Sequence, residues 1–143
     1  MRDVRDALMV ARNTDGKLVR RPLSPHLQVY RWPISMALSI AHRVTGVGLG
    51  LGTLLMTVWL VTAATSDNGF ETLQYFLGSA FGQLLLFGWT LSLIFHLLSG
   101  MRHLYMDTGH GFEAKDYEHS GLAVLVATGA LTVVIWLVGL IVW

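Results

Sequence analysis

Three long uncharged stretches constrain this chain of 143 residues more than any other feature. They cover residues 44–66, 72–101 and 120–143. About 20 apolar residues in a helix cross the roughly 30 Å hydrocarbon core of a bilayer, whereas a soluble helix is rarely apolar on all sides for so long. The pattern therefore predicts an all-α membrane protein with three transmembrane helices.

The N-terminal part of the chain has a different character. Residues 1–33 are polar and contain Pro22, Pro25 and Pro33, and proline disfavours helix in the residue before it. We expect an extended N-terminal arm over residues 1–33 and a helical domain over residues 34–143. The three spans are expected at about residues 38–65, 75–104 and 120–143.

The charges are sided although they nearly cancel. Ten Lys and Arg against nine Asp and Glu leave a net charge of +1, which gives no electrostatic basis for binding nucleic acid. Eight basic residues precede the first stretch, and Arg102 and Lys115 lie between the second and third. The positive-inside rule then predicts a cytoplasmic N-terminus in a bacterial inner (plasma) membrane. The matrix side of the mitochondrial inner membrane is the second choice.

Cysteine is absent from the chain. That excludes disulfides, Cys-ligated zinc, iron–sulfur clusters and a thiol nucleophile. The six histidines remain as candidate ligands for a borderline metal, although His26 in the arm has no assigned role. No carboxylate lies in an uncharged stretch, which argues against a proton- or cation-coupled transporter.

Ser39, His42 and Arg43 form the first polar cluster. The spacings of three and four residues place them on one helix face. A hydroxyl, an imidazole and a fixed cation there could hold an acidic or carbonyl-bearing ligand at the membrane edge. The alternative is that Arg43 has no ligand and merely extends its side chain to the lipid headgroups.

His96 is the deepest ionisable residue of the predicted spans. It precedes Arg102 by six residues, which is about 9 Å of helix. Its neutral imidazole could ligate a haem b iron, with the propionates directed to a cationic collar of His42, Arg43, Arg102 and His103. Alternatively, His96 could be a structural residue that hydrogen-bonds a neighbouring helix. His42 is the only other candidate axial ligand in a span, but it lies nearer the surface, so a second axial histidine from a partner subunit is the simpler interpretation.

Glycines recur in the first span. Gly46 and Gly50, like Gly48 and Gly52, are separated by four positions, a spacing that allows close helix approach. These pairs suggest that further helices join the three.

Two motifs carry a family resemblance. The first is Arg-Pro-Leu-Ser-Pro-His-Leu at residues 21–27, followed by Ser39-x-x-His42-Arg43-x-Thr45-Gly46. The second, at residues 96–109, is His-x-x-x-Gly-Met-Arg-His-Leu-x-Met-Asp-x-Gly. Together with the three spans, they resemble the large, cytochrome b-type membrane-anchor subunits of succinate dehydrogenase, respiratory complex II, over nearly the whole chain.

The resemblance implies a bundle with a second three-helix anchor subunit and one shared haem b. A flavoprotein subunit and an iron–sulfur subunit would dock on the cytoplasmic face. His96 matches the family's axial haem ligand, and the second anchor would supply the other. His42, Arg43 and His103 match positions that contact the haem propionates.

The resemblance also implies a ubiquinone site and a function in electron transport. Ser39 and Arg43 match residues that line this site, and Asp107 is a weaker candidate for proton delivery. The chain would carry electrons from succinate oxidation to quinone as a non-catalytic subunit of the tricarboxylic acid cycle and respiratory chain. The alternatives are a quinol:fumarate reductase anchor and a haem-free structural anchor.

Overall fold

The computed structural model describes residues 9–21 and 31–142, which belong to two compact units divided between Trp32 and Pro33. In the first unit, β1 (Val10–Arg12) and β2 (Leu18–Arg20) form an antiparallel hairpin. Gly16 adopts a φ of 76° in the connecting turn, a conformation that glycine accepts without strain. The stretch that contains His26 lies outside the described residues.

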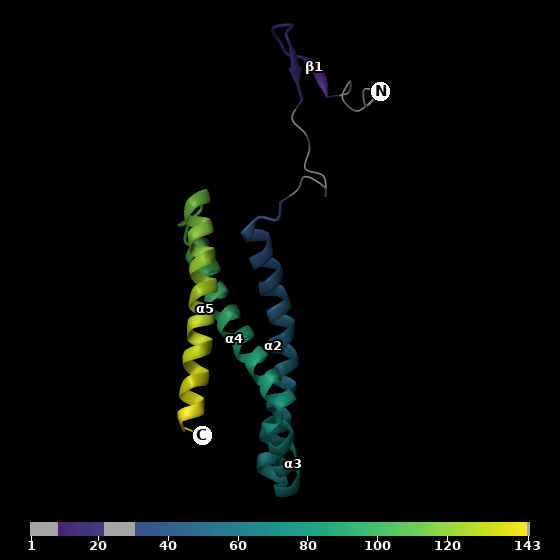
Figure 1. Ribbon diagram of the computed structural model, residues 1–143, viewed down its shortest axis with the longest axis vertical. Coiled ribbons are helices and arrows are strands. Elements are labelled where there is room, and N and C mark those ends of the chain that lie inside the picture. Colours follow the sequence, from purple (N-terminus) through teal and green to yellow (C-terminus); the bar gives the residue numbers. More distant parts are fainter. Residues whose placement is uncertain (1–8, 22–30, 143) are drawn as a thin grey trace. The chain divides into compact units, whose positions relative to one another are not determined.

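The second unit is helical. Helix α4 packs against both α2 and α5, and α2 also contacts α5 (Figure 1). The shorter α3 contacts α2 and α4 at the end of the unit where those two helices are connected. The helices are α2 (Ile34–Thr65), α3 (Asp67–Gly78), α4 (Ala80–Asp107) and α5 (Ala114–Val142).

Three of these helices can cross a membrane by length and composition. Their mean hydropathy is 1.8 in α2, 1.7 in α4 and 2.5 in α5 over the best window of each. Most of their large apolar side chains are exposed, as expected where lipid or another apolar helix surrounds them. The predicted all-α membrane fold is confirmed, and the chain is a multi-pass membrane protein.

The second uncharged stretch is interrupted near its start. Helix α3 ends at Gly78 and α4 begins at Ala80, so the long helix starts later than the expected position of about 75. Ser79 caps α4, because its side chain accepts a hydrogen bond of 3.2 Å from the backbone N–H of Gly82. A Cβ at Gly82 would lie 2.3 Å from the carbonyl oxygen of Phe76, so the tight corner requires glycine there.

A small core joins the three spanning helices. Leu38 of α2, Phe95 of α4 and Val124 of α5 are buried together, with exposed fractions of 6–8%. Phe95 directly precedes His96, and Leu38 lies one turn before His42. The core therefore fixes α2 and α4 beside the histidines.

Candidate functional site

Three imidazole rings meet between α2 and α4. The ring of His42 stacks on that of His96, with centroids 4.0 Å apart and planes inclined by 9°. It also stacks on the ring of His103, at 5.1 Å and 24°. His96 and His103 are seven residues apart and so face the same side of α4. The helix pairing thus gathers three of the histidines that the two motifs contain.

Hydrogen bonds orient the ring of His96. Its Nδ1 lies 3.1 Å from the backbone carbonyl of His42 and 3.3 Å from the hydroxyl of Thr45. The Thr45 hydroxyl is itself 2.9 Å from the carbonyl of Ala41 and 3.0 Å from that of His42, to which it can donate. Because a carbonyl oxygen only accepts hydrogen bonds, Nδ1 of His96 must carry the proton, and it donates a hydrogen bond to the backbone carbonyl of His42. Nε2 then has its lone pair available to a ligand.

Gly46 makes room for this ring on α2. A Cβ at Gly46 would lie 3.1 Å from Cε1 and 3.7 Å from Nδ1 of His96. Gly52 receives Trp89 of α4 even more closely, because its Cβ would stand 2.0 Å from the indole nitrogen. Gly48 and Gly50 have nothing within 4 Å of an added Cβ. Within this chain, two of the four glycines accommodate α4.

The other two histidines differ in their hydrogen bonding. Nε2 of His42 is buried and finds no hydrogen-bond partner among the described residues. His103 is anchored on its own helix, since its Nδ1 lies 2.7 Å from the carbonyl of Ser99. A buried imidazole nitrogen without a partner is costly, so His42 presents an unmet requirement for a polar group.

The remaining predicted site residues lie around this cluster. Arg43 and Asp107 are exposed, and Ser39 is half-buried. Asp107 ends α4, one turn beyond His103. Within residues 9–21 and 31–142, none of the three side chains makes a hydrogen bond or an ion pair, so their polar groups remain available to a ligand, lipid or partner.

Arg102 occupies a place that the motifs did not predict. Instead of joining the expected cationic collar, its Nε donates to the hydroxyl of Ser120 at 2.9 Å and its Nη2 to the carbonyl of Tyr117 at 3.0 Å. The guanidinium carbon also lies 4.1 Å from the centre of the Tyr117 ring, a cation–π contact. Arg102 is only 8% exposed and connects α4 to α5.

Thr45 is the functional candidate that sequence reasoning missed. It stands in the first motif, three residues after His42, but its contact with His96 depends on how α2 and α4 pair. Its spacing of one helical turn from His42 was the available signal.

Comparison with known proteins places this chain in a family. Residues 17–135 match the family described as succinate dehydrogenase/fumarate reductase transmembrane subunit. The chain is 42% identical over 113 residues to a succinate dehydrogenase cytochrome b556 subunit from Paracoccus denitrificans, covering 79% of this chain and 87% of that one. A protein of the same description from Rickettsia felis is 34% identical over 117 residues, covering 82% and 91%.

A mitochondrial relative is similar over a stretch of similar length. The succinate dehydrogenase cytochrome b560 subunit of Bos taurus is 37% identical over 115 residues, which is 77% of this chain and 66% of that one. The match of the family to most of the chain, together with these relatives, leads to one conclusion: this chain belongs to the succinate dehydrogenase/fumarate reductase transmembrane subunit family.

Proposed function

We propose that this chain anchors a succinate:quinone oxidoreductase in the membrane, binds one haem b together with a second anchor subunit, and forms part of the ubiquinone-reduction site. Family membership and the relatives described as cytochrome b subunits support the proposal. The observation that carries it is the hydrogen bond that points Nδ1 of His96 at the carbonyl of His42. Since the chain has no cysteine, an iron–sulfur subunit and a flavoprotein subunit would have to bring the other redox centres.

The residues present fit a b-type haem. His96 offers a neutral imidazole whose other nitrogen is held by a carbonyl, the arrangement common among metal-ligating histidines. The buried, unpartnered Nε2 of His42 could bond a propionate oxygen, and Arg43 and His103 could complete the contacts of the propionates. When bound, haem b supplies a one-electron redox centre at this end of the bundle.

This chain would provide one axial ligand only. Among the described residues, no group of three or more His, Cys, Asp or Glu side chains is arranged to hold a metal ion. The ring of His42 stacks face to face on that of His96 with centroids 4.0 Å apart, which leaves no space for an iron between them, so we assign the second axial histidine to the second anchor subunit. The exposed apolar faces of α2, α4 and α5 are available for the helices of that partner.

Ser39 and Arg43 would act on the quinone. Their separation of four residues places a hydroxyl and a guanidinium on one face of α2, near its first turns. Ser39 would donate a hydrogen bond to a quinone oxygen, while Arg43 would stabilise the negative charge that develops there. Reduction to the quinol consumes two protons, and the exposed carboxylate of Asp107 could pass them from the aqueous side.

The direction of insertion follows from the charges. All ten basic residues lie before the first span or between the second and third along the sequence. This asymmetry supports a cytoplasmic N-terminus in a bacterial inner membrane. Quinone reduction would then occur at the cytoplasmic edge of the bilayer.

A difference spectrum tests the haem ligand. The complex, purified with its partner subunits, should show a b-type α band in the reduced-minus-oxidised spectrum. His96→Ala should abolish the band, whereas His110→Ala in the exposed loop should keep it. A complex without any b-type band would establish the haem-free structural anchor instead. Retention of haem in His96→Ala and its loss in His42→Ala would show that the wrong ligand was chosen.

Quinone kinetics test the second part of the proposal. Ser39→Ala and Arg43→Ala should slow succinate:quinone turnover, while succinate oxidation by a soluble electron acceptor continues at its normal rate. Unchanged quinone turnover and inhibitor affinity in both variants would rule out this site. Faster turnover from quinol to fumarate than from succinate to quinone would favour the fumarate reductase alternative.

A further inference from the structure

A cavity of about 360 Å³ lies far from the histidines, among α2, α3 and α4. Trp59 lines it and follows His42 by 17 residues, which is about 25 Å along α2. The cavity is thus at the opposite end of the bundle, where α3 joins the two long helices. Neither the haem nor the quinone proposal uses it.

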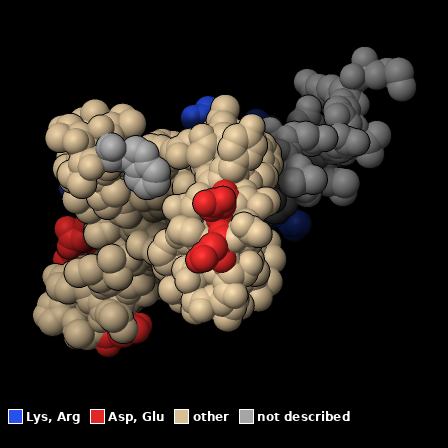
Figure 2. Space-filling model, turned by 90° about the horizontal axis from the view of Figure 1, so that it is seen from below, with Lys and Arg blue, Asp and Glu red and all other residues tan. Residues whose placement is uncertain are grey.

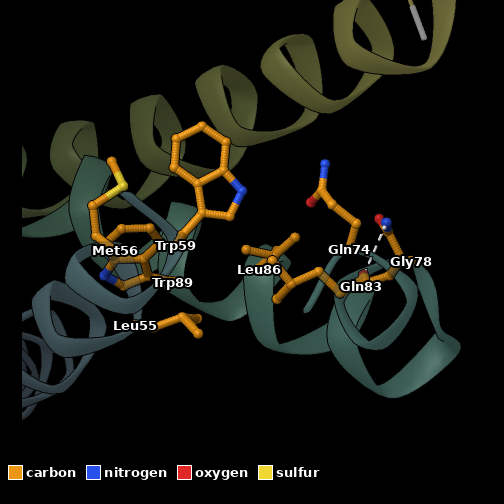
Figure 3. A pocket seen from close by; sticks show the side chains of 9 residues that line it. Leu55, Met56, Trp59, Gln74, Gly78, Gln83, Leu86 and Trp89 are labelled. Carbon is orange, nitrogen blue, oxygen red and sulfur yellow. Dashed lines mark hydrogen bonds between the residues drawn. The ribbon is translucent and has the colours of Figure 1, made fainter. Parts of the chain in front are cut away.

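The lining is apolar with an amide at its edge. Leu55, Leu86 and Trp89 supply hydrocarbon and aromatic surface, and Leu86 lies between Trp59 and Gln74 in Figure 3. The neighbouring Gln83 is already engaged, because its Nε2 donates to the carbonyl of Leu77 at 3.3 Å. An apolar chain with a polar end suits this combination.

The part of the sequence that forms the cavity carries only acidic charges. Asp67 and Glu71 are the only charged residues between Arg43 and Arg102. On α3 they are followed at helical spacings by Gln74 and Gly78, so all four share one face of that helix. Figure 2, which views the molecule from the α3 end, shows acidic atoms exposed on this side.

We propose that this cavity binds a zwitterionic phospholipid whose headgroup carries a primary ammonium, such as phosphatidylethanolamine, rather than the quaternary ammonium of phosphatidylcholine, which cannot donate a hydrogen bond to a carboxylate. One acyl chain would occupy the apolar cavity, and the ammonium group would lie along the acidic face of α3, beside Asp67 and Glu71. An anionic lipid is disfavoured because its headgroup would meet two carboxylates and, among the described residues of the helical unit, no cation at this end. The observation that selects the lipid is this charge complementarity.

Tryptophan fluorescence can detect the lipid directly, because bromine on an acyl chain quenches an indole that it touches. The purified complex would be reconstituted into phosphatidylcholine bilayers that contain increasing fractions of brominated phosphatidylethanolamine or brominated phosphatidylglycerol. Subtracting the Trp59→Phe complex isolates the emission of Trp59. We expect that half of the Trp59 emission is quenched at a fraction of phosphatidylethanolamine about fivefold lower than the fraction of phosphatidylglycerol required.

Two independent variants test the two parts of the site. In the double variant Asp67→Asn with Glu71→Gln, the two lipids should quench Trp59 at equal fractions. Glu113→Gln, which changes an exposed acid near the other end, should keep the preference for the ethanolamine lipid. Gly78→Leu should abolish quenching by either lipid, since Gly78 lines the cavity, has no positive φ and has nothing within 4 Å of an added Cβ. Gly139→Leu on α5 has equal space and serves as its control.

Three results would overturn the proposal. Equal quenching by both lipids in the unmodified complex would show non-specific contact with the bilayer. No quenching of Trp59 by either lipid would show that a protein chain covers the cavity. Undiminished quenching in Gly78→Leu would place the lipid elsewhere. Haem content and quinone turnover do not enter this assay, so it succeeds or fails separately from the proposed function.

Discussion

Replacing Gly46 by alanine tests whether the close approach of α2 and α4 holds the proposed haem ligand. The new Cβ would lie 3.1 Å from Cε1 of His96, whereas carbon atoms pack best at about 3.5–4.0 Å. The ring must therefore withdraw by about 0.4–0.9 Å. That movement lengthens the hydrogen bond of 3.1 Å between Nδ1 and the His42 carbonyl. Overpacking of this kind costs typically about 1–3 kcal/mol.

We place Gly46→Ala near the lower end of that range, since a single atom is added. At about 1–2 kcal/mol, the complex should retain haem about 5- to 30-fold less tightly. The assay is the rate of haem transfer from the purified complex to apomyoglobin, followed by absorbance. Gly48→Ala is the matched control, because nothing lies within 4 Å of its added Cβ and both variants gain the same helix propensity. Equal rates in the two variants would refute the reasoning.

Three further predictions concern the helix contacts. Thr45→Ala should broaden or shift the haem absorption band by loosening the ring of His96, and Thr45→Ser, which keeps the hydroxyl, should restore it. Arg102→Ala should lower the stability of the complex by about 1–3 kcal/mol, because two hydrogen bonds and the ring contact with Tyr117 are lost. The loss should appear as a lower melting temperature, and an unchanged melting temperature would contradict this role of Arg102. Gly52→Ala should reduce assembly of the complex in membranes, measured by subunit co-purification, because its Cβ would collide with the indole of Trp89; Gly50→Ala has open space and should assemble normally.

Residue type and spacing predicted which residues belong to the candidate site, but not which of them contact one another. The rule that places Ser39 and Arg43 on one helix face needs only the local geometry of a helix, so it could be applied before the fold was known. The stacking of His42 on His96 joins residues 54 positions apart, and it depends on which face of each helix turns to the other. The glycine pairs indicated close packing in general, but they did not indicate that Gly46 receives a histidine.

Arg102 illustrates the same limit. A cation at the end of a span is compatible with a haem propionate, a lipid phosphate or a neighbouring helix, and the position of Arg102 six residues after His96 led us to expect the first. The structure directs it to Tyr117 and Ser120 because α5 returns beside α4 and offers a carbonyl and a hydroxyl at that level. The break at Ser79 was likewise hidden, since serine and glycine leave the stretch uncharged.

The sequence by itself determined that the chain is an all-α membrane protein with three spans, and it identified the family through two motifs. Those properties depend on hydropathy summed along the chain and on residue types at short spacings. Only the tertiary structure decided the partner of each polar group, which is His42 and Thr45 for His96 and α5 for Arg102. It also showed the separate helix α3 beside the cavity. Helices that are apolar on nearly all sides carry no polar stripe to fix their rotation, so pairing and rotation emerge only when the helices pack.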